Sequence, residues 1–289
     1  MNLDLDALAA LDAVVREGGF ARAAQRLHRV QSAVSYQVAK LEQQLGLELL
    51  DRQGYRVRLT PAGVSILDEG RKLLAQAQQL QALAAQFRDG WEARLLLIAD
   101  GILPLEKVLL ALKQLAQEGV PTKVQVKIEF LRGVQQRFEK DDADLMIVKD
   151  VDDKPQFARR ALEEIECILC AAPAHPLALL QQVSLQQLQE HTELTIQDSS
   201  DSGNDRHIFG SERVFYLSGF VAKKQALLMA MGYGWMPRFL VEQELRDGSL
   251  REVAYGGGSR YRFTPQLVWQ RNRPLGRAGQ RLLALLEAV

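Results

Sequence analysis

The segment from Thr60 to Gly90 constrains the fold of this chain more than any other. Thr60-Pro61 is a good helix start, because Thr caps helices and Pro favours the first helical position. The predicted helix runs to Asp89-Gly90, a length of about 45 Å at ~1.5 Å per residue. A helix of this length is too long to be buried against its own small domain. We therefore expect it to pack against a second copy of the chain.

Apolar side chains recur along this helix with a period of seven residues. They are Ile66, Leu73, Leu80 and Phe87, and the small residues between them are Gly70, Ala77 and Ala84. A heptad pattern of this kind is typical of a helix that packs closely against a partner helix. We therefore interpret residues 61–90 as the linker and dimerisation helix of a homodimer. The alternative is that the helix packs on the chain's own downstream domain.

The residues before this helix predict a small helical domain. Apolar residues at helical spacing define a first helix that ends at Gly18-Gly19 and a short second helix over residues 20–27. A third helix over residues 31–46 has a buried face with the spacing of an amphipathic helix, formed by Val34, Val38, Leu41 and Leu45.

The opposite face of the third helix carries short hydroxyls, an amide and a tyrosine. Solvated helix faces usually carry Glu and Lys instead, because their helix propensity exceeds that of Ser. In a helix-turn-helix the third segment lies in the major groove of DNA, and its amino-terminal residues contact base edges. We therefore expect base contacts from Gln31, Ser32, Ser35 and Tyr36.

Basic residues surround this helix and the segment that follows it. No acidic residue lies between Gly18 and Leu41 or between Arg52 and Leu67. The residues around a turn at Gln53-Gly54 alternate, which predicts a two-stranded wing with arginines toward a phosphate backbone. The expected phosphate contacts are Arg22, Lys40, Arg52 and Arg56. From pattern alone, a plain structural three-helix domain remains the alternative.

Residues 20–63 resemble the amino-terminal signature of LysR-type transcriptional regulators nearly end to end. Their sequence is FARAAQRLHRVQSAVSYQVAKLEQQLGLELLDRQGYRVRLTPAG. The matching positions are Ala23, Ala24, Gln31, Ser35, Leu41, Glu42, Leu45, Gly46, Arg52, Thr60 and Gly63. Two positions depart from the family pattern. Val30 replaces a hydroxyl that commonly caps the recognition helix. Tyr36 stands where many members have Arg, so the base preference at this position does not transfer.

After Trp91, short apolar strands alternate with helices. The predicted strands include RLLLIA, KVQVKIEF, DLMIV, IECILCAA, ELTIQ, VFYLS and TPQLVWQ. This alternation favours a largely parallel sheet with helices on both faces, in which ligands bind beyond the carboxyl ends of the strands. Three segments of this region resemble, more loosely, the effector domain of the same family. They are AHPLA, GYGWMPRFLVEQELRDGSLREV and LVWQRNRPLGRAGQRLLALLE.

This resemblance implies an α-helical winged helix-turn-helix domain over residues 1–60, a long linker helix over 61–90, and an effector domain over 91–289. The effector domain would be a two-lobed α/β fold, similar to periplasmic binding proteins, that binds a small-molecule effector between its lobes. The first lobe would contain about residues 91–162 and 265–289, and the second about 163–264. Implied partners are double-stranded promoter DNA, a second copy in a homodimer or homotetramer, and RNA polymerase.

Candidate effector-binding residues lie where strands end and a helix begins. They are Asp100, Gly101, Lys149, Asp150, Ser199, Ser200, Phe220 and Val221. An ionised Asp100 would repel an anion, so we expect the ligand to present a donor or a positive group toward it. Ser199, Ser200 and the helix that starts at Phe220 would hold the other end of the ligand. The alternative is that Asp100 only caps the helix opened at Pro104.

Composition argues against several other classes of protein. The 36 basic and 36 acidic residues balance, so a general polyanion-binding protein is not indicated. Cys167 and Cys170 fall in a predicted buried strand, where positions three apart face opposite ways, so we expect core packing and no metal or disulfide. No apolar run approaches the roughly 18 residues of a membrane span, and the amino end is acidic. We expect a cytoplasmic protein without a membrane partner.

Catalytic motifs are not evident in the sequence. The histidines occupy no metal-binding or nucleophile-activating spacing, and neither a GxSxG motif nor a P-loop occurs. We therefore predict no enzyme activity, no metal and no cofactor. The alternative function is a small-molecule binding protein without DNA function, which would leave the polar face of the third helix unexplained.

Overall fold

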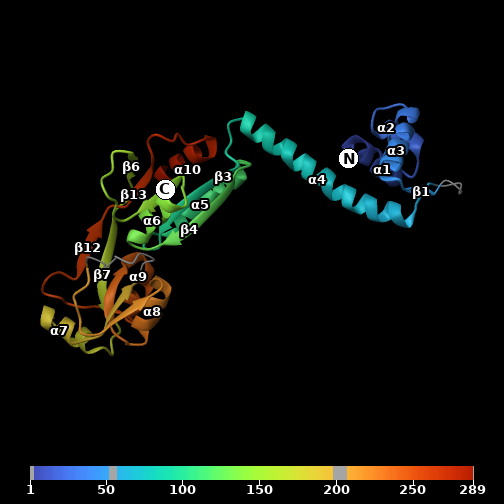
Figure 1. Ribbon diagram of the computed structural model, residues 1–289. Coiled ribbons are helices and arrows are strands. Elements are labelled where there is room, and N and C mark those ends of the chain that lie inside the picture. Colours follow the sequence, from blue (N-terminus) through green and yellow to red (C-terminus); the bar gives the residue numbers. More distant parts are fainter. Residues whose placement is uncertain (1–2, 52–56, 198–206, 289) are drawn as a thin grey trace. The chain divides into compact units, whose positions relative to one another are not determined.

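The computed structural model describes residues 3–51, 57–197 and 207–288. The chain divides into two compact units, Met1–Asp89 and Gly90–Val289, which are shown in Figure 1. No helix in the described ranges is both long enough and apolar enough to cross a lipid bilayer.

The amino-terminal unit is a helical cluster with a two-stranded ribbon. Its elements are α1 (Leu5–Glu17), α2 (Phe20–Arg26), α3 (Gln31–Leu45), β1 (Leu50–Asp51), β2 (Arg58–Leu59) and α4 (Pro61–Arg88). The core is formed by buried residues of α1, α2 and α3 together with Leu49, Leu50 and Leu67. Ala23 and Ala24 are buried where α2 meets its neighbours, because small side chains allow helices to approach closely.

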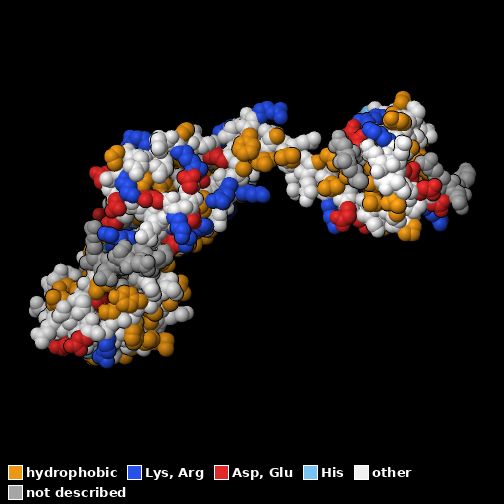
Figure 2. Space-filling view, in the orientation of Figure 1, with side chains coloured by type: hydrophobic (Ala, Val, Ile, Leu, Met, Phe, Trp, Pro, Cys, Tyr) orange, Lys and Arg blue, Asp and Glu red, His pale blue; other side chains and the backbone are white. Residues whose placement is uncertain are grey.

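Helix α4 has two halves with different surroundings. Its first turns pack on its own unit: Gly63, Leu67 and Gly70 are buried, and a Cβ at Gly70 would lie 2.9 Å from Leu8 Cδ2. Ile66 packs against the same core. The three later residues of the heptad pattern, Leu73, Leu80 and Phe87, are exposed. In Figure 2, apolar side chains are visible on the surface along this helix.

The carboxyl-terminal unit contains two sheets, each forming one lobe. The first has the order β4-β3-β5-β13-β6. Its strands are β3 (Arg94–Asp100), β4 (Lys123–Glu129), β5 (Leu145–Val148), β6 (Phe157–Ala161) and β13 (Gln266–Gln270). Buried residues of α5 (Leu105–Gln117) and α10 (Arg277–Ala288) cover one face, and those of α6 (Arg132–Lys140) cover the other.

The second lobe has a sheet of order β11-β7-β10-β8-β9, with β12 also paired to β7. Its strands are β7 (Ile165–Ala171), β8 (Glu193–Ile196), β9 (Val214–Leu217), β10 (Tyr233–Pro237), β11 (Arg251–Glu252) and β12 (Arg260–Phe263). Its helices are η1 (Pro176–Leu179), α7 (Leu185–Gln189), α8 (Phe220–Leu228) and α9 (Arg238–Asp247). Helices α8 and α9 pack on one face of this sheet, and η1 and α7 pack on the other.

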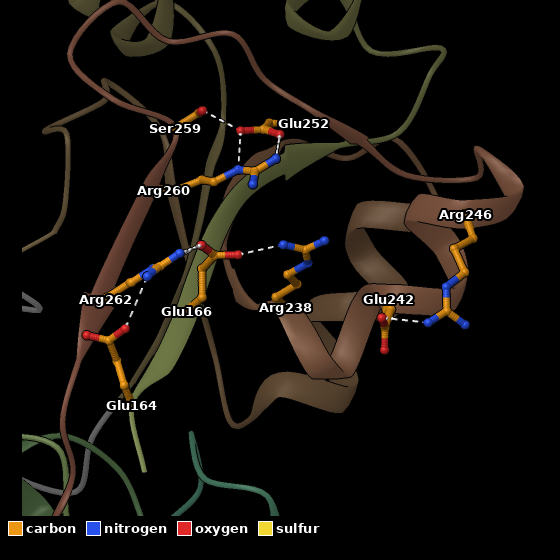
Figure 3. A network of polar contacts seen from close by, with 9 residues as sticks. All are labelled: Glu164, Glu166, Arg238, Glu242, Arg246, Glu252, Ser259, Arg260 and Arg262. Atoms are coloured by element: carbon orange, nitrogen blue, oxygen red, sulfur yellow. Dashed lines mark hydrogen bonds and ion pairs between the residues drawn. The ribbon is translucent and has the colours of Figure 1, made fainter.

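Ion pairs attach β12 and α9 to the outer side of β7, as Figure 3 shows. Glu166 accepts hydrogen bonds from Arg262, its register partner on β12, at 3.1 Å, and from Arg238 of α9 at 2.8 Å. Glu252 Oε2 likewise accepts a hydrogen bond from Arg260 Nη2 at 2.6 Å. Because side chains alternate along a strand, these contacts leave the neighbouring Cys167 on the opposite face of β7.

The expectation of a largely parallel sheet is wrong. Strands β4 and β5 run parallel to β3, whereas β13 runs antiparallel to β5 and to β6. In the second lobe, β10 and β12 are antiparallel to β7. Mixed pairing arises because the chain leaves the first lobe after β6 and returns to it at β13. Strands β6, β10, β11 and β12 and helix α9 are not among the elements predicted from the sequence.

Candidate DNA-binding surface and effector cavity

Helix α3 presents the expected polar face to the surface. Val34, Val38 and Leu41 are fully buried, whereas Gln31, Ser32, Ser35 and Tyr36 are all exposed, Tyr36 to 69%. Val30 is the N-cap residue and supplies no side-chain hydrogen bond, as expected from its apolar side chain. The surface at this end of α3 is therefore open, uncharged and rich in hydrogen-bonding groups.

Three of the signature residues hold the base of the wing. Glu42 Oε1 accepts hydrogen bonds from the backbone N–H groups of Leu49 at 2.8 Å and Leu50 at 3.1 Å. The Thr60 hydroxyl donates to the Glu48 carbonyl and accepts from Gly63 N at 2.9 Å. A Cβ at Gly63 would lie 2.1 Å from the Leu49 carbonyl oxygen. Glu42, Thr60 and Gly63 are thus scaffold residues that fix β1 and β2 beside α3 and α4.

The basic residues expected at phosphates have different surroundings. Arg22 is exposed, and no carboxylate of the described residues pairs with it. Lys40 instead forms an ion pair with Asp4, the N-cap of α1, at 3.1 Å. Arg52 and Arg56 lie outside the described residues, as does the turn at Gln53-Gly54. Of these four side chains, only Arg22 is seen on the surface without an ion-pair partner.

A small cavity of about 20 Å³ lies between the two lobes of the carboxyl-terminal unit. It is lined from the first lobe by Asp100, Ile102, Phe130, Leu131 and Lys149. From the second lobe it is lined by Cys167, Ile196, Phe220, Lys223, Trp235 and Tyr261. Its polar groups are few and its walls are mainly aromatic and aliphatic, which is the usual character of a small-molecule site.

Three of the expected effector-binding residues meet in this cavity: Asp100, Lys149 and Phe220. Gly101 is adjacent, and a Cβ there would lie 2.2 Å from the Phe130 ring, so this glycine makes room for a lining residue. Asp150 and Val221 are exposed and are not among the lining residues. Ser199 and Ser200 lie outside the described residues.

Asp100 is bound to the backbone on both sides of its carboxylate. Oδ1 accepts from Ile102 N at 3.1 Å, and Oδ2 accepts from Lys149 N at 3.5 Å. Burial raises the pKa of Asp100 to about 7, and the backbone donors and the Lys149 charge only partly offset this. The carboxyl group thus closes the turn between β3 and α5, but it does not cap α5, whose N-cap residue Pro104 lacks a side-chain hydrogen bond.

Most residues that line the cavity were not predicted from the sequence. Cys167, Trp235 and Tyr261 come from neighbouring strands, with Tyr261 directly opposite Cys167 and β10 paired along β7. Both cysteines are buried, but only Cys170 packs in the lobe core, because Cys167 faces the cavity. Lys223 lies three residues after Phe220 on the same helix face, which is the one local signal that could have found it.

A helix-turn-helix with an open polar recognition face, joined to a two-lobed α/β unit with an enclosed cavity, defines the class of ligand-responsive DNA-binding regulators. Comparison with known families agrees. Residues 5–64 match the model described as bacterial regulatory helix-turn-helix protein, lysR family, and residues 88–289 match the LysR substrate binding domain. The chain therefore belongs to the LysR family of transcriptional regulators, whose members are not enzymes.

Individual relatives support this assignment. The probable HTH-type transcriptional regulator YhaJ of Escherichia coli strain K12 is 31% identical over 261 residues, covering 87% of this chain and 86% of that protein. The fold resembles that of an OxyR mutant from Corynebacterium glutamicum, with TM-score 0.68 and 17% identity over 100% of this chain and 93% of the other. Vibrio fischeri DarR, solved in complex with DNA, has TM-score 0.51 and 18% identity, covering 99% of both chains.

Proposed function

We propose that this regulator reads promoter DNA in the major groove with the exposed amino-terminal face of α3. The observation that carries the proposal is the division of this helix into a fully buried apolar face and an exposed face of Gln31, Ser32, Ser35 and Tyr36. An α-helix fits the major groove, and short amide and hydroxyl side chains can bond to base edges there. Acidic groups, which phosphates would repel, do not occur on this face.

Phosphate contacts would position the helix on the duplex. Arg22 at the start of α2 is an exposed cation, and Arg52 and Arg56 belong to the expected wing. Lys40 would contact phosphate only by leaving Asp4, so its main role in the proposal is to attach α3 to the amino end of α1. These contacts carry most of the salt-dependent affinity, whereas the α3 face carries the sequence preference.

A dimer would present two such helices to a palindromic site. The exposed residues Leu73, Leu80 and Phe87 of α4 supply an apolar stripe that suits a second copy of the helix. In this proposal the DNA-binding domain ends at about residue 60 and the dimerisation helix ends at about residue 90. A small-molecule effector in the cavity between the lobes would adjust the DNA contacts, and the regulator would act in the cytoplasm together with RNA polymerase. We also propose that two such dimers associate as a homotetramer.

The proposal is tested by selecting bound sequences from a random DNA pool and measuring affinity for the selected and random duplexes. Ser35→Ala and Gln31→Ala should each reduce the preference for the selected site by about 1 to 3 kcal/mol. The matched controls are Ser65→Ala, an exposed serine on α4, and Gln44→Ala at the far end of α3. Equal losses on selected and random DNA, or no selected sequence at all, would contradict the proposal.

A further inference from the structure

A second cavity lies where the first lobe meets the two chain segments that connect the lobes. Its volume is about 300 Å³. Cavities that bind small molecules begin at roughly this size. No described residue lines both this cavity and the small one between the lobes. We call it the crossover cavity, because its walls include both connecting segments.

The two connecting segments are joined to each other beside this cavity. The first runs from β6 to β7, and the second runs from β12 to β13. The Leu162 N–H in the first segment donates a hydrogen bond to the Pro265 carbonyl in the second at 2.9 Å. Leu162 and Pro265 both line the crossover cavity. A molecule bound there would therefore contact both of the segments through which the lobes are connected.

The inner wall of the crossover cavity is apolar. Val108 of α5, Ile147 of β5 and Leu286 of α10 are 2%, 3% and 6% exposed, and all three belong to the core of the first lobe. Of the twelve described lining residues, nine are aliphatic and none is aromatic. Water finds few hydrogen-bond partners against such a wall, so its displacement by an apolar ligand is favourable.

The volume of the crossover cavity sets the size of its ligand. An apolar cavity of about 150 Å³ is large enough to hold one benzene molecule. A cavity of about 300 Å³ therefore holds a molecule of roughly two fused rings. A larger ring system would extend into solvent and gain nothing from the apolar wall.

The three charged residues in the described lining are all paired. Lys107 Nζ of α5 lies 2.5 Å from Glu163 Oε2 in the first connecting segment. Glu287 Oε2 of α10 lies 2.9 Å from Arg160 Nη1 of β6. A charged ligand would have to break one of these pairs or bring an unpaired charge to the apolar wall, and both cost free energy. The lining therefore favours a neutral ligand.

The Lys107–Glu163 pair can still bind one polar group of a ligand. The two side chains are 34% and 77% exposed, so the pair lies between the apolar wall and solvent. The ammonium only donates hydrogen bonds, and the carboxylate only accepts them. A hydroxyl can donate to Glu163 and accept from Lys107 at the same time. An amine or an acid, by contrast, is attracted by one member of the pair and repelled by the other.

We propose that the crossover cavity is a second ligand site of this regulator, and that its ligand is a neutral apolar molecule of about two fused rings with one hydroxyl. The rings lie on Val108, Ile147 and Leu286, and the hydroxyl meets the Lys107–Glu163 pair. The site is separate from the cavity between the lobes and from the proposed DNA contacts. Ligand binding alone therefore tests it, whatever the outcome for DNA.

The first experiment compares ligands of one size that differ in charge. Binding of 2-naphthol, decahydro-2-naphthol, 2-naphthoate and 2-naphthylmethylamine to the full-length protein is measured at neutral pH by calorimetry and by the shift in melting temperature. At least one of the two alcohols should bind and raise the melting temperature. The acid and the amine should bind about tenfold more weakly or not at all. Failure of both alcohols to bind would overturn the proposal, as would equal or tighter binding of the acid or the amine.

The second experiment locates the site with variants that fill it. Val108→Phe and Ala161→Trp enlarge one buried and one exposed lining residue, and each should lower the affinity for the alcohol about tenfold. The matched control is Ala116→Trp, an exposed position of α5 outside the described lining. Melting temperatures of the free variants show whether they fold. Normal binding of the alcohol by both folded variants would overturn the assignment of the site.

The third experiment tests the ion pair by removing either partner. Glu163→Gln removes the carboxylate and should raise the affinity for 2-naphthoate about fivefold, because Lys107 can then attract the acid. Lys107→Met should raise the affinity for 2-naphthylmethylamine by a similar factor. The matched control is Lys113→Met, an exposed lysine of α5 outside the described lining. An unchanged order of preference and unchanged affinities in both variants would show that the pair does not meet the ligand, and would overturn the proposal.

Discussion

Replacing Asp100 by asparagine should make the carboxyl-terminal unit more stable at alkaline pH. The carboxyl group is buried, and burial raises its pKa from 3.8 to about 7. Between these two values the native protein holds a proton that the unfolded chain releases. The stabilisation associated with this group is therefore fully present below about pH 4 and is lost as the pH rises through 7.

The size of the effect follows from the pKa difference. A shift from 3.8 to about 7 corresponds to about 4 kcal/mol at ~1.36 kcal/mol per pKa unit. Asparagine is neutral at every pH and keeps an oxygen for Ile102 N, but it loses the longer contact with Lys149 N at 3.5 Å. Above pH 8 we expect Asp100→Asn to raise the free energy of unfolding by about 2 to 4 kcal/mol, and near pH 4 to change it by less than about 1 kcal/mol.

Urea unfolding followed by tryptophan fluorescence measures this difference in the intact chain. Trp91, Trp235 and Trp269 are the three tryptophans of the sequence, and all lie in the carboxyl-terminal unit, so the signal reports on that unit. The control is Glu106→Gln, which removes an exposed carboxylate from the first turn of α5. A difference between wild type and Asp100→Asn that does not grow between pH 4 and pH 8 would refute the reasoning.

Two further predictions concern the amino-terminal unit. Gly63→Ala should lower its free energy of unfolding by about 1 to 3 kcal/mol, because the added Cβ would lie 2.1 Å from the Leu49 carbonyl oxygen. The loss of helix on unfolding is followed by circular dichroism. The control Gly19→Ala should be nearly neutral, because a Cβ there meets nothing within 4 Å. Leu80→Glu should dissociate the proposed dimer in sedimentation without unfolding the monomer, since Leu80 is 67% exposed, whereas the control Gln79→Glu should not. An unchanged mass for Leu80→Glu would place the dimer contact elsewhere.

Most of the amino-terminal unit is predictable from the sequence because its signals are local. The predicted third helix, residues 31–46, differs from α3 only at its last residue. The start of α4 follows from Thr60 and Pro61, which act as expected. The role of Gly70 is different from that expected: it meets Leu8 of α1 and therefore serves packing within one chain. Spacing alone cannot say which copy of a chain a small residue faces.

The cavity is less predictable because strand pairing brings distant residues together. Asp100, Lys149 and Phe220 carry local signals, since two follow strand ends and one opens a helix. Trp235 and Tyr261 reach the cavity only because β10 and β12 both pair with β7. The sequence fixes neither pairing: GYGWM carries glycines that weaken a strand signal, and RYRF alternates charge with aromatic rings.

The charge that a cavity presents to a ligand depends on which groups the backbone has already used. Asp100 is the conspicuous charge in the sequence of the first strand, yet both of its oxygens accept backbone hydrogens, one of them from Lys149. That contact holds the Lys149 backbone beside the end of β3, while the side chain extends to Tyr261 and His207. Asp100 is thus a positioning residue for Lys149. Because its burial also favours the neutral carboxyl form, Asp100 can hold a cation in place without cancelling the attraction of that cation for an anion.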